Sequence, residues 1–200
     1  MADQVEIFVP EATFPESENA LVSEIYGNAG VILEYGSGAS TFLAAELGAK
    51  KIISVESDAG WAANMDALVQ KRDLADRIRI HYANIGPTGK WGRPVDASGW
   101  KRYHRYPLSV WELDDFDHPD VIMIDGRFRA GCLLAALFFI KKPVKVLFDD
   151  YVNRPQYAKA VEGYIKPSKI VGRMALFDLE PRPFSVADFS KVIPIFQHSF

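Results

Sequence analysis

Short apolar runs alternate with amphipathic segments along most of this chain. Continuous apolar runs between helical patterns are typical of parallel strands that helices cover on both faces. The expected strands are residues 30–35, 51–56, 78–82, 120–125 and 144–149, and the expected helices are residues 40–47, 59–70, 128–141 and 154–165. The pattern therefore predicts an α/β fold with a single doubly wound, mostly parallel sheet and helices on both faces.

The two ends of the chain extend this prediction. Thr13-x-x-Glu16 has the form of a capping box, so we expect an N-terminal helix over residues 15–27. Residues 170–179 have the pattern of a strand, and residues 192–196 that of a candidate second strand whose place in the sheet the pattern does not set. We expect one domain over residues 1–200, with its core at 30–180 and an insertion at 84–118.

The first expected strand ends in a tight glycine turn, Glu34-Tyr35-Gly36-Ser37-Gly38-Ala39-Ser40-Thr41. Glycine lets a ligand lie against bare backbone, and the following helix presents N–H groups and a positive dipole end to it. A nucleotide-like cofactor is the expected occupant. The dinucleotide fingerprint would have a third glycine in place of Thr41, and the Glu34 carboxylate would repel a pyrophosphate but attract an amine.

This turn resembles motif I of the class I S-adenosylmethionine (AdoMet)-dependent methyltransferases, Glu/Asp-x-Gly-x-Gly-x-x-Ser/Thr. The resemblance covers residues 15–180 and implies a Rossmann-like methyltransferase fold with AdoMet as cofactor. Glu56 ends the next strand, where a carboxylate can accept hydrogen bonds from both ribose hydroxyls. The residues expected to bind the cofactor are Glu34, Gly36, Ser37, Gly38, Ser40, Thr41, Glu56, Ser57, Asn84, Ile85 and Asp125.

A long connection, residues 84–118, separates the third strand from the fourth. Its first part, residues 90–106, interleaves cations with tryptophans and tyrosines, which suits a sugar ring, a phosphate or a base. The other interpretation is a surface flap whose aromatic side chains pack onto the sheet edge. The candidate residues for binding the acceptor are Trp91, Arg93, Arg102, Arg105 and, after the fourth strand, Arg127.

Three carboxylates stand at the ends of the fourth and fifth strands: Asp125, Asp149 and Asp150. Neighbouring strands lie about 5 Å apart, so these acids should converge and repel one another unless a proton, a cation or an arginine compensates. The pattern resembles the cation-dependent O-methyltransferases of the catechol type, although Asp150 replaces the asparagine of that family. This resemblance implies a Mg²⁺ site at the three acids. Arg127 and Arg129 could neutralise them instead.

Composition and charge limit the class of protein. Of the 200 residues 48% are hydrophobic, so we expect a folded chain, and the net charge of −3 argues against a nucleic-acid partner. The single cysteine, Cys132, excludes a disulfide framework. The first six residues lack the basic start of a secretory signal, and the longest apolar run, residues 130–140, is too short for a membrane span. We therefore expect a cytoplasmic protein without membrane association.

The expected function is transfer of a methyl group from AdoMet to a small-molecule acceptor, an anionic or sugar-like compound, by O-methylation. Catalysis would depend on in-line positioning and on a base, with Asp125 the first candidate and Asp149 the second. Two alternatives stay open. An NAD(P)-dependent oxidoreductase would use the same turn and Glu56, but it leaves Glu34 and Thr41 unexplained. A methyltransferase-like domain could also bind a nucleoside or a protein partner without catalysis.

Overall fold

The computed structural model describes residues 7–11, 13–183 and 188–199, so the first six residues lie outside it. Its centre is a seven-stranded sheet in the order β3-β2-β1-β4-β5-β7-β6. The strands are β1 (Val31–Tyr35), β2 (Lys51–Glu56), β3 (Ile78–Tyr82), β4 (Val121–Ile124), β5 (Val144–Phe148), β6 (Lys169–Val171) and β7 (Met174–Leu179). Strands β1 to β5 are parallel, and β7 pairs antiparallel with β5 and β6. The predicted sheet is therefore confirmed.

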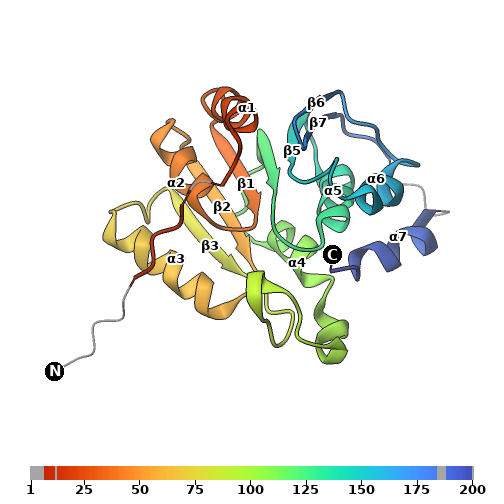
Figure 1. Cartoon of the computed structure of the whole chain (residues 1–200), viewed down its shortest axis with the longest axis horizontal. Coiled ribbons are helices and arrows are strands. Elements are labelled where there is room, and N and C mark those ends of the chain that lie inside the picture. The colour runs from red at the N-terminus through yellow and green to blue at the C-terminus, as the bar shows by residue number, and fades with distance from the viewer. Residues whose placement is uncertain (1–6, 12, 184–187, 200) are drawn as a thin grey trace.

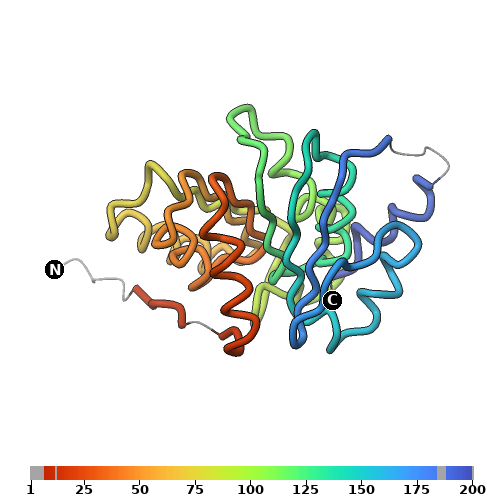
Figure 2. Tube along the Cα trace, turned by 90° about the horizontal axis from the view of Figure 1, so that it is seen from above, coloured from red at the N-terminus to blue at the C-terminus, as the bar shows by residue number. Residues whose placement is uncertain are grey.

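Helices cover both faces of this sheet (Figure 1). The helices are α1 (Glu16–Tyr26), α2 (Ala39–Glu46), α3 (Ala59–Lys71), α4 (Arg105–Leu108), α5 (Arg129–Phe139), α6 (Pro155–Val161) and α7 (Phe189–Phe196). Helices α1 to α3 pack on one face and α4 to α7 on the other. The early strands and their helices lie to one side of β4 and the later ones to the other (Figure 2). Within the described ranges, none of these helices has the length and apolarity to cross a bilayer.

Each central strand supplies both layers of the core. Leu33 and Ile122 belong to the cluster under α5, whereas their neighbours Ile32 and Met123 belong to the cluster under α1 to α3. Successive side chains of a strand point to opposite faces, so a strand that is apolar at every position must be covered twice. All four side chains are at most 1% exposed, and each contributes about 1.5–3 kcal/mol by burial.

The start of the first helix differs from the prediction. Helix α1 begins at Glu16 after Pro15, whose backbone is extended (φ −57°, ψ 161°), and no side chain caps it. The capping box expected from Thr13 is therefore wrong. Proline serves at this boundary because the first helical N–H groups have no partner within the helix, so the missing donor costs little.

The C-terminal part differs more. The strand expected at residues 170–179 is a hairpin, in which β6 and β7 turn at Gly172 with a φ of +54°. The candidate strand at residues 192–196 is helix α7, which packs Val192 against the core and Ile195 and Phe196 beside it. Spacings of three and four residues bring these side chains to one helical face. A run of apolar residues this short does not distinguish a strand from a helix by periodicity.

Asp120, just before β4, ties this strand to the start of β1. Its Oδ2 accepts hydrogen bonds from the N–H groups of Gly30 at 3.0 Å and Val31 at 2.9 Å. We expect Asp120→Ala to lower the free energy of unfolding by roughly 1–2 kcal/mol, because two backbone donors lose their acceptor. Urea denaturation measures this change. Asp117→Ala is the control, since the exposed pair of Asp117 with Lys51 should contribute about 0–1 kcal/mol. Equal losses would contradict the assignment.

Candidate functional site

The strand order reverses between β1 and β4, and the carboxyl ends of such strands form the crevice where α/β proteins bind ligands. Gly36 follows β1 there, and Asp125 and Gly126 follow β4. A Cβ on Gly36, where φ is +107°, would lie 2.7 Å from the Gly126 nitrogen. Only glycine therefore lets the two strand ends approach this closely.

The second glycine of the turn serves a different purpose. Gly38 has an extended backbone (φ −177°), which any residue can adopt. A Cβ on Gly38 would meet no atom within 4 Å, so the fold itself does not require glycine here. Two hydrogen bonds hold the turn: Gly38 N–H donates to Thr41 Oγ1 at 3.2 Å, and the Trp61 indole N–H donates to the Ser37 carbonyl at 3.0 Å. The result is fixed, bare backbone beside open space, as a bound ligand needs.

Glu34 supports the turn from below. It is fully buried and accepts hydrogen bonds from the Tyr26 hydroxyl at 2.7 Å and from Thr41 Oγ1. Burial raises the pKa of Glu34, while hydrogen bonds from Thr41, Tyr26 and Ser40 act in the opposite direction. Glu34 is thus held by Tyr26 and Thr41 beneath the turn. The expected contact between Glu34 and the cofactor is not available in this arrangement.

Glu56 lies across the crevice from Asp125, at the end of β2. Its Oε1 accepts from the N–H groups of Ser57 at 2.6 Å and Asp58 at 2.9 Å, and its Oε2 accepts from the Ser37 hydroxyl at 3.1 Å. Burial raises the pKa of Glu56, and the two N–H groups oppose this. The β3–β4 connection covers this carboxylate, because the Gly92 carbonyl accepts from the Ser57 hydroxyl at 3.0 Å.

Asn84 and Ile85, the cofactor residues expected after the third strand, contact the β3–β4 connection. Asn84 Oδ1 accepts from the Gly86 N–H at 3.0 Å and from Arg102 at 3.1 Å. Ile85 is 1% exposed, with Gly99 packed against its carbonyl group. Arg102 therefore holds the loop after β3, which differs from its predicted role as an acceptor ligand.

Arginines surround the acids at the ends of β4 and β5. Asp149 is 2% exposed and receives two hydrogen bonds from Arg173, at 2.8 and 3.0 Å. Asp150 pairs with Arg154 at 3.1 Å and with Arg173 at 3.3 Å. The described part of the chain holds no group of three or more His, Cys, Asp or Glu residues arranged to bind a metal ion. The arginines compensate the negative charges of these acids, whose mutual repulsion was the reason to expect a cation. The predicted Mg²⁺ site therefore has no support in this geometry.

Asp125 differs from its two neighbours. It pairs with Arg129 at 2.9 Å, yet its side chain stays 31% exposed to the crevice. Burial raises the pKa of Asp125 to about 7, and the charges of Asp149 and Asp150 add to this effect against the opposing charge of Arg129. A carboxyl group that ionises near neutral pH suits a general base. Asp149 is occupied by two hydrogen bonds from Arg173, so Asp125 remains the candidate base.

Some residues of the β3–β4 connection belong to the core and others are exposed. It contains the 3-10 helices Lys90–Gly92, Ala97–Arg102 and Ser109–Glu112 besides α4. Tyr103 and Tyr106 pack on Phe128, at 5.3 and 5.7 Å between ring centres, so these two aromatic residues belong to the core. Trp91 is 73% exposed, and Arg105 is exposed as well. The binding surface expected over residues 90–106 is thus much smaller than predicted.

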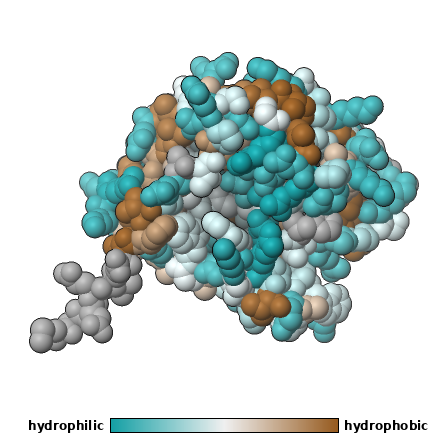
Figure 3. Space-filling model, viewed as in Figure 1, coloured by the Kyte–Doolittle hydropathy of each residue, from teal (hydrophilic) through white to brown (hydrophobic). Residues whose placement is uncertain are grey.

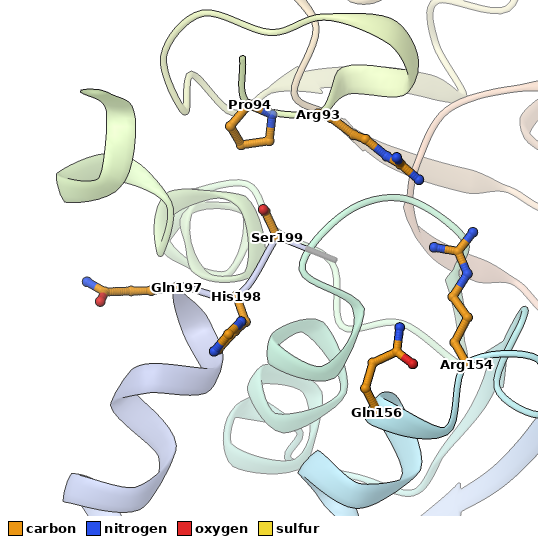
Figure 4. Close-up of a pocket in the computed structure, with 7 residues that line it drawn as sticks. All are labelled: Arg93, Pro94, Arg154, Gln156, Gln197, His198 and Ser199. Carbon is orange, nitrogen blue, oxygen red and sulfur yellow. The ribbon is translucent and has the colours of Figure 1, made fainter. Parts of the chain in front are cut away.

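Among the residues of this connection that were predicted to bind the methyl acceptor, Arg93 lines a cavity (Figure 4). The cavity has a volume of about 490 Å³. Its lining residues are Arg93, Pro94, Arg154, Gln156, Gln197, His198 and Ser199. The connection lies near the C-terminal end of the chain (Figure 1), and apolar surface on this face forms separate patches between hydrophilic residues (Figure 3). The sequence missed every lining residue beyond the connection, because only the fold brings α6 and the C-terminal residues there.

Comparison with known proteins yields a structural relative. A methyltransferase-like protein from Silicibacter pomeroyi is 43% identical to this chain, with a TM-score of 0.88 over 95% of this chain and 98% of that one. The chain belongs to the class I methyltransferase superfamily. No protein-family model and no curated protein matches it.

More distant members of this superfamily share the fold alone. The O-methyltransferase TomG from Streptomyces achromogenes, solved in complex with SAM, is 14% identical, with a TM-score of 0.56 over 82% of this chain and 80% of that one. A SAM-dependent O-methyltransferase from Thermotoga maritima is 14% identical, with a TM-score of 0.55 over 88% of this chain and 69% of that one. This membership supports the methyltransferase resemblance over the nicotinamide alternative.

The pKa of Asp125 predicts how stability depends on pH. Because this pKa is raised from 3.8 to about 7, the folded chain holds the proton more tightly, and this contribution to stability is lost as pH rises from about 4 to about 7. Asp125→Asn has no such loss. The melting temperature of the variant minus that of the parent should therefore increase over this range and then level off.

Thermal melts at a series of pH values measure this difference. Asp96→Asn is the control, because the Ser98 hydrogen bond lowers the pKa of Asp96. The melting temperature of this variant minus that of the parent should therefore stay constant from about pH 4 to about pH 7. A flat difference for Asp125→Asn too would show that Asp125 ionises like an ordinary carboxylate.

Proposed function

We propose that this chain is an AdoMet-dependent methyltransferase that methylates a hydroxyl group of a small-molecule acceptor. One observation carries the proposal: the Gly36 turn lies against Gly126, so a ligand on the turn is next to Asp125, whose pKa is about 7. Two of the structural relatives are O-methyltransferases, which supports the same class of reaction.

The residues around the turn fit this cofactor. Gly38 offers open backbone, and the N–H groups at the start of α2 provide the positive end of a helix dipole. Glu56 Oε2 accepts from the Ser37 hydroxyl, a contact that a ribose hydroxyl could replace. The Gly92 segment, which now bonds to Ser57, would move aside to admit the ribose.

Residues of the chain would remove the proton of the acceptor hydroxyl. When bound, AdoMet would supply an electrophilic methyl group. Asp125, ionised above about pH 7, would accept the proton that the acceptor hydroxyl loses as its oxygen bonds to the methyl carbon. Arg129 holds the Asp125 carboxylate at 2.9 Å and so fixes the direction of that transfer.

Cofactor binding tests the proposal directly. Gly38→Val should abolish AdoMet binding, because the branched side chain would occupy the open space beside the turn. Glu56→Gln should weaken binding by roughly 1.5 kcal/mol, through loss of the charge that accepts the ribose hydroxyls. Calorimetric titration with AdoMet and S-adenosylhomocysteine measures both effects.

Gly163→Val is the matched control, since a Cβ on Gly163 also meets no atom within 4 Å and this residue lies after α6, outside the turn. It should bind AdoMet like the parent. A parent chain that does not bind AdoMet, or a Gly38→Val variant that binds it normally, would refute the assignment.

A further inference from the structure

The cavity lined by Arg93 and Arg154 carries positive charge from two sides. Arg93 comes from the β3–β4 connection and Arg154 from the start of α6, and their guanidinium groups point toward one another across the cavity (Figure 4). Arg154 is matched by Asp150 at 3.1 Å. Arg93 forms no ion pair with any of the described residues, and the described residues that line the cavity include no Asp or Glu. Among the described residues, Arg93 is therefore a cation of the lining without a counter-charge.

Arg127 adds a second cation to this region. It is only 6% exposed, and neither its Nε nor its Nη1 has a hydrogen-bond partner among the described residues. Arg127 lies in the turn after β4, two residues beyond Asp125. Burial lowers the pKa of Arg127, and the charges of Arg129 and Arg93 lower it further. A buried guanidinium whose Nε and Nη1 lack acceptors is costly, and an anion bound there would supply those acceptors.

We infer that this cavity binds the anionic group, a carboxylate or a phosphate, of a small methyl acceptor through Arg93 and Arg127. This inference rests on the proposed function, which it extends to the class of acceptor. The guanidinium group matches both anions by paired hydrogen bonds. A volume of about 490 Å³ suits a small molecule rather than a polymer.

The position of Arg127 also restricts the shape of the acceptor. Asp125 and Arg127 belong to the same turn between β4 and α5, with Gly126 between them. A hydroxyl group at Asp125 and an anion at Arg127 must therefore belong to one compact molecule. A hydroxy acid or a hydroxyl-bearing phosphate ester meets this requirement.

Titration with small probes tests the inference without a known acceptor. The probes are inorganic phosphate, 3-hydroxybenzoate and its neutral analogue 3-hydroxybenzamide, each titrated calorimetrically into the full chain. Phosphate or 3-hydroxybenzoate should bind in the millimolar range or better, and 3-hydroxybenzamide should not. The anion that binds more tightly distinguishes a phosphate ester from a carboxylic acid.

Variants locate the site. Arg127→Met and Arg93→Gln should each weaken binding of the anion about tenfold or more, because each removes a charged donor. Lys159→Gln and Lys101→Gln are matched controls, exposed on α6 and in the same connection, and should bind like the parent. Without the anion Arg127→Met should melt no lower than the parent, since the Nε and Nη1 groups that it removes make no hydrogen bond within the described residues.

The outcomes separate this inference from the proposed function. AdoMet binding without anion binding overturns the inference alone, as does an equal loss in the Lys159→Gln control. A lower melting temperature for Arg127→Met, with unchanged anion affinity, would show a structural role and also overturn it. Anion binding in a chain that does not bind AdoMet would overturn the assignment to an acceptor.

Discussion

The buried guanidinium of Arg129 fixes the ends of the two strands on which the site is built. It is 3% exposed and donates to the carbonyl groups of Asp149 at 2.6 Å, Asp125 at 2.8 Å and Gly126 at 3.0 Å, besides pairing with the Asp125 carboxylate. A buried charge is tolerated only when its donors are satisfied in this way. Because Arg129 also begins α5, the helix, both strand ends and the candidate base form one rigid unit.

Charge balance around this unit gives the three acids different properties. Arg173 neutralises Asp149, and Asp150 pairs with Arg154, so both carboxylates are held in ion pairs. Asp125 shares Arg129 with these neighbours. Burial is the main cause that raises the pKa of Asp125 to about 7, and the negative charges of Asp149 and Asp150 add to it. The arginines thus fulfil the role that a divalent cation would otherwise have, and leave one carboxyl group available for proton transfer.

The sequence predicted the elements that a local pattern of residues determines. It did not predict the contacts that the C-terminal part of the chain makes with the site. Strands β1 to β5, the glycine turn and Glu56 follow from apolar runs and from spacing, and the structure has them at those positions. The partner of Asp149 could not be predicted, because Arg173 reaches it through a hairpin that the pattern suggested was one strand. The cavity is a similar case, since His198 follows a helix that the pattern assigned to a strand.

One short segment of the β3–β4 connection joins the two halves of the site. Trp91 has a left-handed backbone (φ +63°), which turns the chain so that Gly92 bonds to Ser57 while the next residue, Arg93, lines the cavity. A Cβ on Gly92 would lie 2.5 Å from the Ser57 hydroxyl oxygen, so this contact depends on glycine. The same short segment thus contacts the residue that follows Glu56 and contributes Arg93 to the cavity.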